Sequence, residues 1–348
     1  MVEGMKIFTD LHHGDLHFSL HLLFEKRLGF ELYRPIGLEW FHAGYWKVAE
    51  PYGNKMDTVN QFLGLTPGLY DPYKNINGQH FVKDDVYHVY IPGHDYHQKA
   101  VTLEKFKSMN FDIILRSHPA HGHIYERLRN QFHPKAKIIM QMGNIKQRTH
   151  LPNVLHSNSY SPKPHQHCIR YHQEINPKHF YYVDPPKGEK NIYSVVNCAP
   201  YLNLYNKYKG SVLDANWKYY GSRSPDGALS GARKVAEKMR DANIAWHLKP
   251  SGGVGHSTKG WFATGRPLVT NMSEHRKAGG DALSLFEPGT TCIDLDSGSV
   301  HDNTKKIRQL LDPDENLKWA KRVNRRWKDI INYDRDEERI RKFLENLQ

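Results

Sequence analysis

The chain has 348 residues, of which 39% are hydrophobic and 12% aromatic, so the composition excludes a disordered protein and allows one large or two ordinary domains. No run approaches the roughly 18 apolar residues of a membrane-spanning helix, and we expect no membrane span. The formal net charge of +12 favours a polyanionic partner, which could be nucleic acid, an anionic membrane surface or a nucleotide. A basic protein with scattered lysines is the simpler alternative.

Cysteine usage and the first residues indicate the compartment. Cys168, Cys198 and Cys292 are far apart, which argues against a disulfide framework or a cysteine zinc site. The first ten residues lead into a strand-like segment and show no signal-peptide pattern. We therefore expect a cytoplasmic protein.

The first half of the chain alternates between predicted strands and helices. A strand at 5–10, an amphipathic helix at 16–28 that ends at Gly29, and a strand at 30–37 have the length of a parallel crossover unit. Residues 39–85 are rich in Gly, Pro, Tyr and Asn and are interpreted as an insertion. The alternation resumes with strands at 86–91, 111–119 and 136–144 and helices at 102–109 and 122–132.

A second alternating set follows a Pro- and His-rich stretch, whose end at 185–190 is interpreted as a linker. It has strands at 191–197, 244–250, 266–271 and 292–296, with helices at 231–242, 257–264, 300–312, 315–332 and 334–347. We predict an α/β protein with two facing Rossmann-like domains, at 1–185 and 190–332, and a terminal helix at 333–348. Ligands would bind at the carboxyl ends of the strands.

A glycine-rich loop precedes the helix at 257–264 and is typical of phosphate binding. Its glycines would let the backbone approach a ligand, its hydroxyl residues could cap the helix, and its basic residues add positive charge. The donor-binding candidates here are Lys249, Gly252, Gly253, Gly255, His256, Ser257, Thr258 and Lys259. An ordinary strand–turn–helix crossover is the alternative.

The run from 252 to 269, with 282–296 after it, resembles the donor domain of GT-B glycosyltransferases. Ala263, Gly265 and Pro267 match the A-x-G-x-P element of that family. The resemblance covers residues 190–348 and implies a nucleotide sugar bound between two Rossmann-like domains, with no other cofactor required and a divalent metal left open. Many relatives carry a ribose-binding glutamate where this chain has Gly260, so the resemblance implies that Glu274 or Asp281 replaces it, or that phosphate and base contacts suffice.

Arg223 is a further candidate for the donor side. It follows the strand-like residues 217–221 and precedes a predicted helix, and a guanidinium offers paired donors to a diphosphate. The alternative is a surface turn built on residues 225–227.

Three clusters of histidine and aspartate follow predicted strands, so we expect them to line one cleft. They are Asp10, His12, His13, Asp15, His17 and His21; His94, Asp95 and His97; and His118, His121 and His123. In a transferase, His13 and Asp15 are candidates for the catalytic base, with His118 as partner or phosphate contact. A metal-dependent phosphoesterase is the rival interpretation, but no diagnostic ligand motif such as HExxH occurs and no metal site is predicted. The third interpretation is that these clusters arise by chance, because the chain has 23 histidines.

Basic and aromatic residues interleave at 202–210 and 216–223, a mixture that suits phosphate contact with base stacking. In its bulk properties the chain is similar to the GT-B enzymes that glycosylate hydroxymethylated bases in viral DNA. The leading interpretation is therefore a hexosyl- or pentosyltransferase acting on hydroxymethylated pyrimidine in DNA. The alternatives are a cell-surface saccharide as acceptor, the phosphoesterase, or a non-catalytic nucleic-acid-binding protein.

Overall fold

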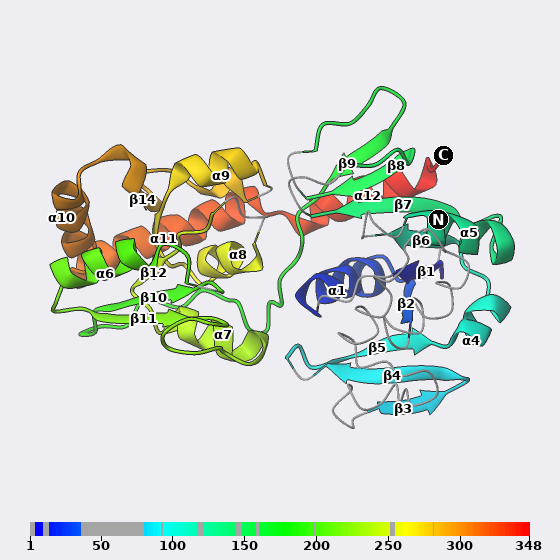
Figure 1. Ribbon diagram of the computed structural model, residues 1–348, viewed down its shortest axis with the longest axis horizontal. Helices are drawn as coiled ribbons and strands as arrows, with labels where there is room; N and C mark the ends of the chain where they lie inside the picture. The colour runs from blue at the N-terminus through cyan, green and yellow to red at the C-terminus, as the bar shows by residue number, and fades with distance from the viewer. Residues whose placement is uncertain are drawn as a thin grey trace, which may run out of the picture.

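The computed structural model describes residues 4–9, 14–35, 80–91, 93–116, 122–143, 148–157, 160–197, 199–250, 255–280 and 282–348. Over these residues the chain forms two sheets with helices around them, one sheet in each half of the molecule (Figure 1). The predicted α/β class and the two Rossmann-like units are confirmed.

Within the described residues, the first sheet has nine strands in the order β3-β4-β5-β2-β1-β6-β7-β8-β9. From β5 to β9 every neighbouring pair is parallel, whereas β3, β4 and β5 form an antiparallel meander at one edge. The strands are β1 (Lys6–Thr9), β2 (Glu31–Pro35), β3 (His80–Lys83), β4 (Val86–Ile91), β5 (Tyr96–Val101), β6 (Ile113–Arg116), β7 (Lys137–Met142), β8 (Asn153–His156) and β9 (His167–Arg170). The helices beside them are α1 (Gly14–Leu20), η1 (His21–Arg27), α4 (Leu103–Ser108) and α5 (Gly122–Phe132).

The predicted helix at 16–28 is two helices of different winding. After α1 the chain continues directly into η1, a π-helix. Leu23, Phe24 and Leu28 from this stretch are buried in the core on the first sheet. A π-helix is rare and is often found at a functional site, so η1 marks this part of the molecule for closer attention.

The second sheet is parallel throughout its described strands, in the order β11-β10-β12-β13-β14. They are β10 (Asn191–Val195), β11 (Asn216–Tyr220), β12 (Ile244–Trp246), β13 (Leu268–Thr270) and β14 (Cys292–Asp294). The helices around them are α6 (Leu202–Ser211), α7 (Gly231–Arg240), α8 (His256–Ala263), α9 (Met272–Ala278), α10 (Val300–Leu310) and α11 (Pro313–Ile330), with short 3-10 turns η4 (Leu283–Leu285) and η5 (Leu295–Ser297).

Aromatic residues build the core of the second sheet. Tyr205 and Tyr208 of α6 pack with Trp217, Tyr219 and Trp246 in one buried cluster. The aromatic residues at 202–210 and 216–223 were predicted to stack on nucleic-acid bases. This prediction is wrong for the two from α6 and the two from β11 in this cluster, because their rings are buried in the core.

The chain returns to the first sheet at its end. Helix α12 (Tyr333–Glu345), red in Figure 1, lies beside β8 and β9. Phe343 stacks on His167 with ring centroids 4.5 Å apart, and Ile340 and Leu344 join the core of the first sheet. The division into 1–185, 190–332 and 333–348 stays a prediction, and this packing attaches the last of the three to the first sheet. No described helix has the length and apolar character needed to cross a membrane.

A connecting segment, residues 171–190, is anchored to the helices of the second sheet. The buried Arg266 guanidinium donates to the carbonyl oxygens of Val183 at 3.0 Å and Arg240 at 2.8 Å. At Gly265, where φ is +74°, an added Cβ would lie 2.4 Å from the ring of Tyr182. The glycine of the A-x-G-x-P element is thus required by the chain's own packing.

Gly260 occupies an equally crowded position on α8. A Cβ there would lie 2.8 Å from Met239 Sδ and 2.9 Å from the ring of Phe180 in the connecting segment. No side chain fits without displacement of these neighbours. The packing of this chain therefore requires glycine at position 260.

We predict that Gly260→Ala lowers the free energy of unfolding by about 1–3 kcal/mol, the range typical of overpacking in a core. Gly210→Ala is the matched control, because it also lies in a helix and an added Cβ there meets nothing within 4 Å. The control should be neutral or stabilising by about 0.5–1 kcal/mol. Urea denaturation of both variants checks this, and an unchanged stability of Gly260→Ala would contradict the packing described.

Candidate donor site

The carboxyl edge of the second sheet is built from the loops that follow its parallel strands. Two of these loops are tied together, because Ser222 N donates to Asn197 Oδ1 at 2.9 Å and Ser224 Oγ donates to Val196 O at 3.0 Å. At Gly221, where φ is +145°, a Cβ would lie 2.5 Å from Val196 O. Only glycine permits this approach, so the loops after β10 and β11 are held in one arrangement.

Lys249 lies on the same edge, three residues after β12. Its side chain is half-buried, and burial lowers the pKa of its ammonium group. Within the described residues no carboxylate or carbonyl oxygen bonds its Nζ. A desolvated charge without a partner is costly, so this position favours an anionic ligand.

Two neutral histidines support this edge. Burial and then Lys249 lower the pKa of His275 to about 4, and burial holds the pKa of His247 well below its usual value. Thr270 Oγ1 donates to His247 O at 2.7 Å, so at 2.8 Å it accepts from Nε2–H of His275. Both rings stay uncharged near neutral pH and leave Lys249 as the cation of this group.

The first turn of α8 carries several of the predicted donor-binding residues. His256 and Ser257 are half-buried there, directly after Gly255, whose φ is +40°. Thr258 is buried and its hydroxyl bonds His247 Nε2 at 2.9 Å, so in this structure it supports the histidine pair. Gly252 and Gly253 lie outside the described residues.

Lys259 faces the connecting segment. It is fully buried, and its Nζ donates to the carbonyl oxygen of Gln173 at 3.0 Å. This bond joins α8 to a residue 86 positions earlier in the sequence. The predicted pair of phosphate-binding lysines is thus divided between two environments, and of the two only Lys249 has an ammonium group without a partner among the described residues.

Arg223 lies on the far side of β10 from Lys249. It is exposed, has a φ of +58°, and makes no ion pair within the residues that the structure describes. Because β11 and β12 flank β10, and neighbouring strands are about 4.8 Å apart, the ends that carry Arg223 and Lys249 are separated by about 10 Å at backbone level. The turn predicted at 225–227 is also present, with Gly227 N bonded to Ser224 O.

The predicted catalytic residues of the first half are not described: His13 and His118 lie outside the described residues, and so does the side chain of Asp15. His21 of the first histidine cluster lines one cavity with the second cluster, as expected, but the expected location at a carboxyl edge is wrong for His94, Asp95 and His97. They lie at the β4–β5 hairpin, whose turn is beside the start of β2 because β5 and β2 are parallel. Among the described side chains no three His, Cys, Asp or Glu residues lie close enough to hold a metal ion.

Sequence reasoning missed three of the residues that shape these sites. His247 carried a signal, since it is a histidine at the end of an otherwise apolar strand. Glu25 also carried one, because it stands four residues after His21, and the two side chains form an ion pair in η1. His275 carried no signal that separates it from the other histidines.

No protein-family model and no curated protein matches the sequence. Among solved structures, sucrose-phosphate synthase from Thermosynechococcus elongatus is similar over 97% of this chain and 98% of its own, with a TM-score of 0.59 and 12% identity. TarM is similar over 98% of both chains, with a TM-score of 0.55 and 10% identity. A variant of TarM from S. aureus has a TM-score of 0.54. The pneumococcal O-GlcNAc transferase GtfA, solved with UDP and GlcNAc, has a TM-score of 0.54 and 9% identity over 99% of both chains.

The chain has the GT-B fold. The likeness extends over both sheets, so the resemblance noted for residues 190–348 holds for the first half as well. In the GT-B fold two Rossmann-like units face each other, and the edge with Lys249 belongs to the second of them.

We predict that the neutral state of His275 makes stability depend on pH. Its folded pKa lies below the value near 6.5 of an unfolded histidine, so the unfolded state binds the additional proton. The free energy of unfolding should fall as the pH drops from about 6.5 to 4, by up to about 3 kcal/mol from this residue.

The variant His275→Gln keeps an N–H for Thr270 and does not titrate. Urea denaturation at several pH values should show a smaller loss of stability for this variant than for the wild type. Identical pH profiles would contradict the assignment.

Proposed function

We propose that the chain is a glycosyltransferase that binds the diphosphate of a nucleotide sugar at Lys249. The observation that carries this proposal is the half-buried ammonium of Lys249, which has no partner in the described residues and lies at the carboxyl edge of a parallel sheet. A diphosphate would supply the missing anion and recover the cost of desolvating the lysine.

Arg223 and the first turn of α8 complete the proposed donor site. Arg223 would bind the diphosphate from the other side of β10, and the positive end of the α8 dipole would face the same anion. We assign Gly252, Gly253, Gly255, His256 and Ser257 to this cradle. Thr258 and Lys259 hold the cradle in place through His247 and Gln173.

The reaction follows from this placement of charge. The acceptor oxygen forms a bond to the anomeric carbon while the bond from that carbon to the diphosphate oxygen breaks. Negative charge then develops on the departing nucleoside diphosphate, where Lys249 and Arg223 stabilise it. GtfA was solved with UDP and GlcNAc, and this supports UDP and a hexose as the donor of this chain.

Glu274 is our candidate for the ribose hydroxyls. It lies in the first turn of α9, after β13 on the same edge, and its side chain is mostly buried. Its carboxylate accepts from Lys277 Nζ at 2.7 Å, which holds it in position. A carboxylate from α9 would replace the one that Gly260 leaves no room for on α8. Asp281, the other residue considered for this role, lies outside the described residues.

The acceptor is a hydroxyl compound whose class is less defined. The aromatic residues expected to stack on DNA bases belong to the core of the second sheet, so they do not support a DNA base as acceptor. Only the net charge of +12 favours a DNA acceptor. A metal-dependent phosphoesterase is not favoured, because GtfA, a solved structure similar over 99% of this chain, is a glycosyltransferase.

UDP binding tests the proposed donor site. We predict that UDP raises the melting temperature and that Lys249→Ala weakens its binding about 10- to 100-fold, the loss expected for one charge-assisted contact. Lys305→Ala, on the exposed face of α10, is the control and should bind UDP as the wild type does. Calorimetric titration with UDP measures both, and equal affinities for wild type and Lys249→Ala would overturn the assignment.

For the catalytic base we propose His13 and Asp15, with His118 as their partner. His13→Ala and Asp15→Ala should each lower the release of UDP from a UDP-hexose by about 10²- to 10⁴-fold, as loss of a general base does. Their affinity for UDP should stay unchanged, since neither belongs to the diphosphate site. His301→Ala is the control histidine variant, exposed on α10. Undiminished turnover in both variants would show that the base lies elsewhere.

A further inference from the structure

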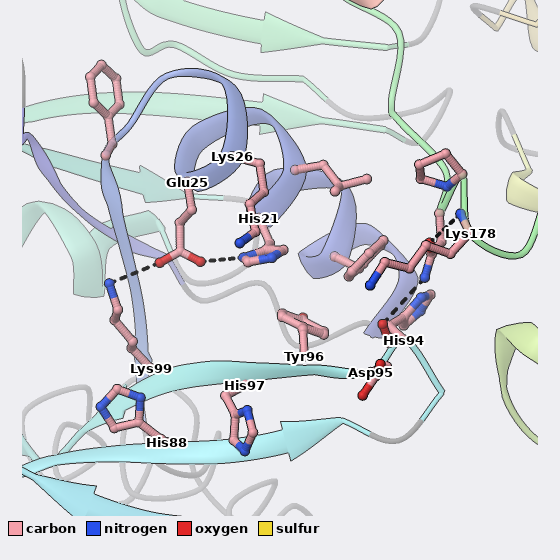
Figure 2. A pocket seen from close by; sticks show the side chains of 15 residues that line it. His21, Glu25, Lys26, His88, His94, Asp95, Tyr96, His97, Lys99 and Lys178 are labelled. Carbon is pink, nitrogen blue, oxygen red and sulfur yellow. Dashed lines mark hydrogen bonds and ion pairs between the residues drawn. The ribbon is translucent and has the colours of Figure 1, made fainter.

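A cavity of about 560 Å³ with a mixed polar and apolar lining lies in the half of the molecule that holds the first sheet (Figure 2). It opens between η1, the β4–β5 hairpin and residues 176–178 of the connecting segment. This is a different place from the carboxyl edge of the second sheet, and the donor site proposed above uses none of its residues. Such a volume suits a small organic ligand.

The acidic side chains of this cavity are already occupied. Glu25 forms an ion pair with His21, accepts from Lys99 Nζ at 3.2 Å and accepts from Leu32 N at 3.2 Å. Burial alone would raise the pKa of Glu25, but His21 and Lys99 lower it overall, so the carboxyl is ionised and compensated. Asp95 accepts from Tyr90 Oη at 2.9 Å.

Two lysines from different elements of the lining are not compensated. Lys26 extends from η1 and Lys178 from the connecting segment, and both are exposed at the cavity (Figure 2). Neither forms an ion pair or a side-chain hydrogen bond with any residue that the structure describes. Glu25 is neutralised and Asp95 contributes one negative charge, so the two lysines leave a net positive charge facing the cavity, and this charge favours an anionic ligand.

The remaining wall is suited to hydroxyl groups and to the faces of a ring. The exposed His97 offers polar atoms, whereas the buried Asn176 amide is bonded to His94 O and Lys178 N. Phe18 stacks on His94 with centroids 4.3 Å apart, and His21 lies 4.6 Å from the ring of Tyr96. These contacts fix the aromatic rings and the imidazole of His21, so the wall is rigid before any ligand binds.

We propose that this cavity binds a sugar or polyol that carries a phosphate or carboxylate group, with Lys26 and Lys178 on the anion. The ligand would bridge η1 and the connecting segment. That segment already meets the hairpin, because Asn176 Nδ2 donates to His94 O at 3.4 Å. Beyond it the hairpin touches α7, where a Cβ on Gly93 would lie 3.3 Å from Gly231 Cα. This binding does not depend on the transfer reaction or on the donor site.

The test is a calorimetric titration with glucose 6-phosphate and with glucuronate, in the presence of saturating UDP. Wild type and Lys249→Ala should both bind at least one of these probes, whereas uncharged glucose should not bind. The double variant Lys26→Gln/Lys178→Gln should bind at least 10-fold more weakly. The control double variant Lys135→Gln/Lys137→Gln removes two exposed lysines elsewhere on the same half and should bind as the wild type does.

A variant that is expected to bind more tightly separates a lost contact from a loss of folding, because a misfolded protein would not gain affinity. Asp95→Asn removes a negative charge from the cavity and keeps an oxygen for Tyr90 Oη, so it should bind glucose 6-phosphate several-fold more tightly. The proposal is overturned if the wild type binds neither probe, if both double variants lose binding equally, or if Asp95→Asn binds no more tightly than the wild type.

Discussion

An ammonium group that is partly withdrawn from water and has no described partner is the constraint around which the second sheet is organised. Lys249 occupies this position, and its depressed pKa records the cost of its burial. His247 and His275 lie beside it and stay neutral, so they add no further positive charge. The charge of Lys249 is therefore not compensated by any anionic group among the described residues, and a bound anion would compensate it.

The residues that resemble a donor-binding motif also pack against the chain's own connecting segment. Gly260 and Gly265 admit Phe180 and Tyr182 of the connecting segment, and Lys259 bonds Gln173 in the same segment. The motif thus joins α8 to the connection between the two sheets. The ligand contacts proposed for the loop before α8 leave these chain contacts intact, because Lys259, Gly260 and Gly265 come after that loop.

The second sheet could be predicted from the sequence, and parts of the first could not. Strands such as β10, β12 and β13 are buried on both faces and appear as short apolar runs. Strand β5 could not be predicted, because its residues 96–99 are polar or aromatic and form no apolar run before the helix predicted at 102–109. Both β8 and β9 lie in a stretch rich in Pro and His, whose composition gives no periodic signal.

The sequence predicts which residues belong to the candidate donor site, but it does not predict what their side chains contact. Lys249 and Lys259 look equivalent in the sequence, as two lysines that flank a glycine loop. Only the fold shows that Gln173 takes the second, while the first has no described acceptor. The environment of His21 and Glu25 was likewise not predictable from the sequence. Glu25 also pairs with Lys99, which lies 74 residues later in the chain and is brought close only by the fold.

A crystal structure of the chain with UDP would test the central claim most directly. We predict that oxygen atoms of the diphosphate lie within about 3 Å of Lys249 Nζ, the distance of a charge-assisted hydrogen bond, with Arg223 approaching from the far side of β10. An ordered UDP bound elsewhere, with Lys249 Nζ still lacking an anion, would contradict the account.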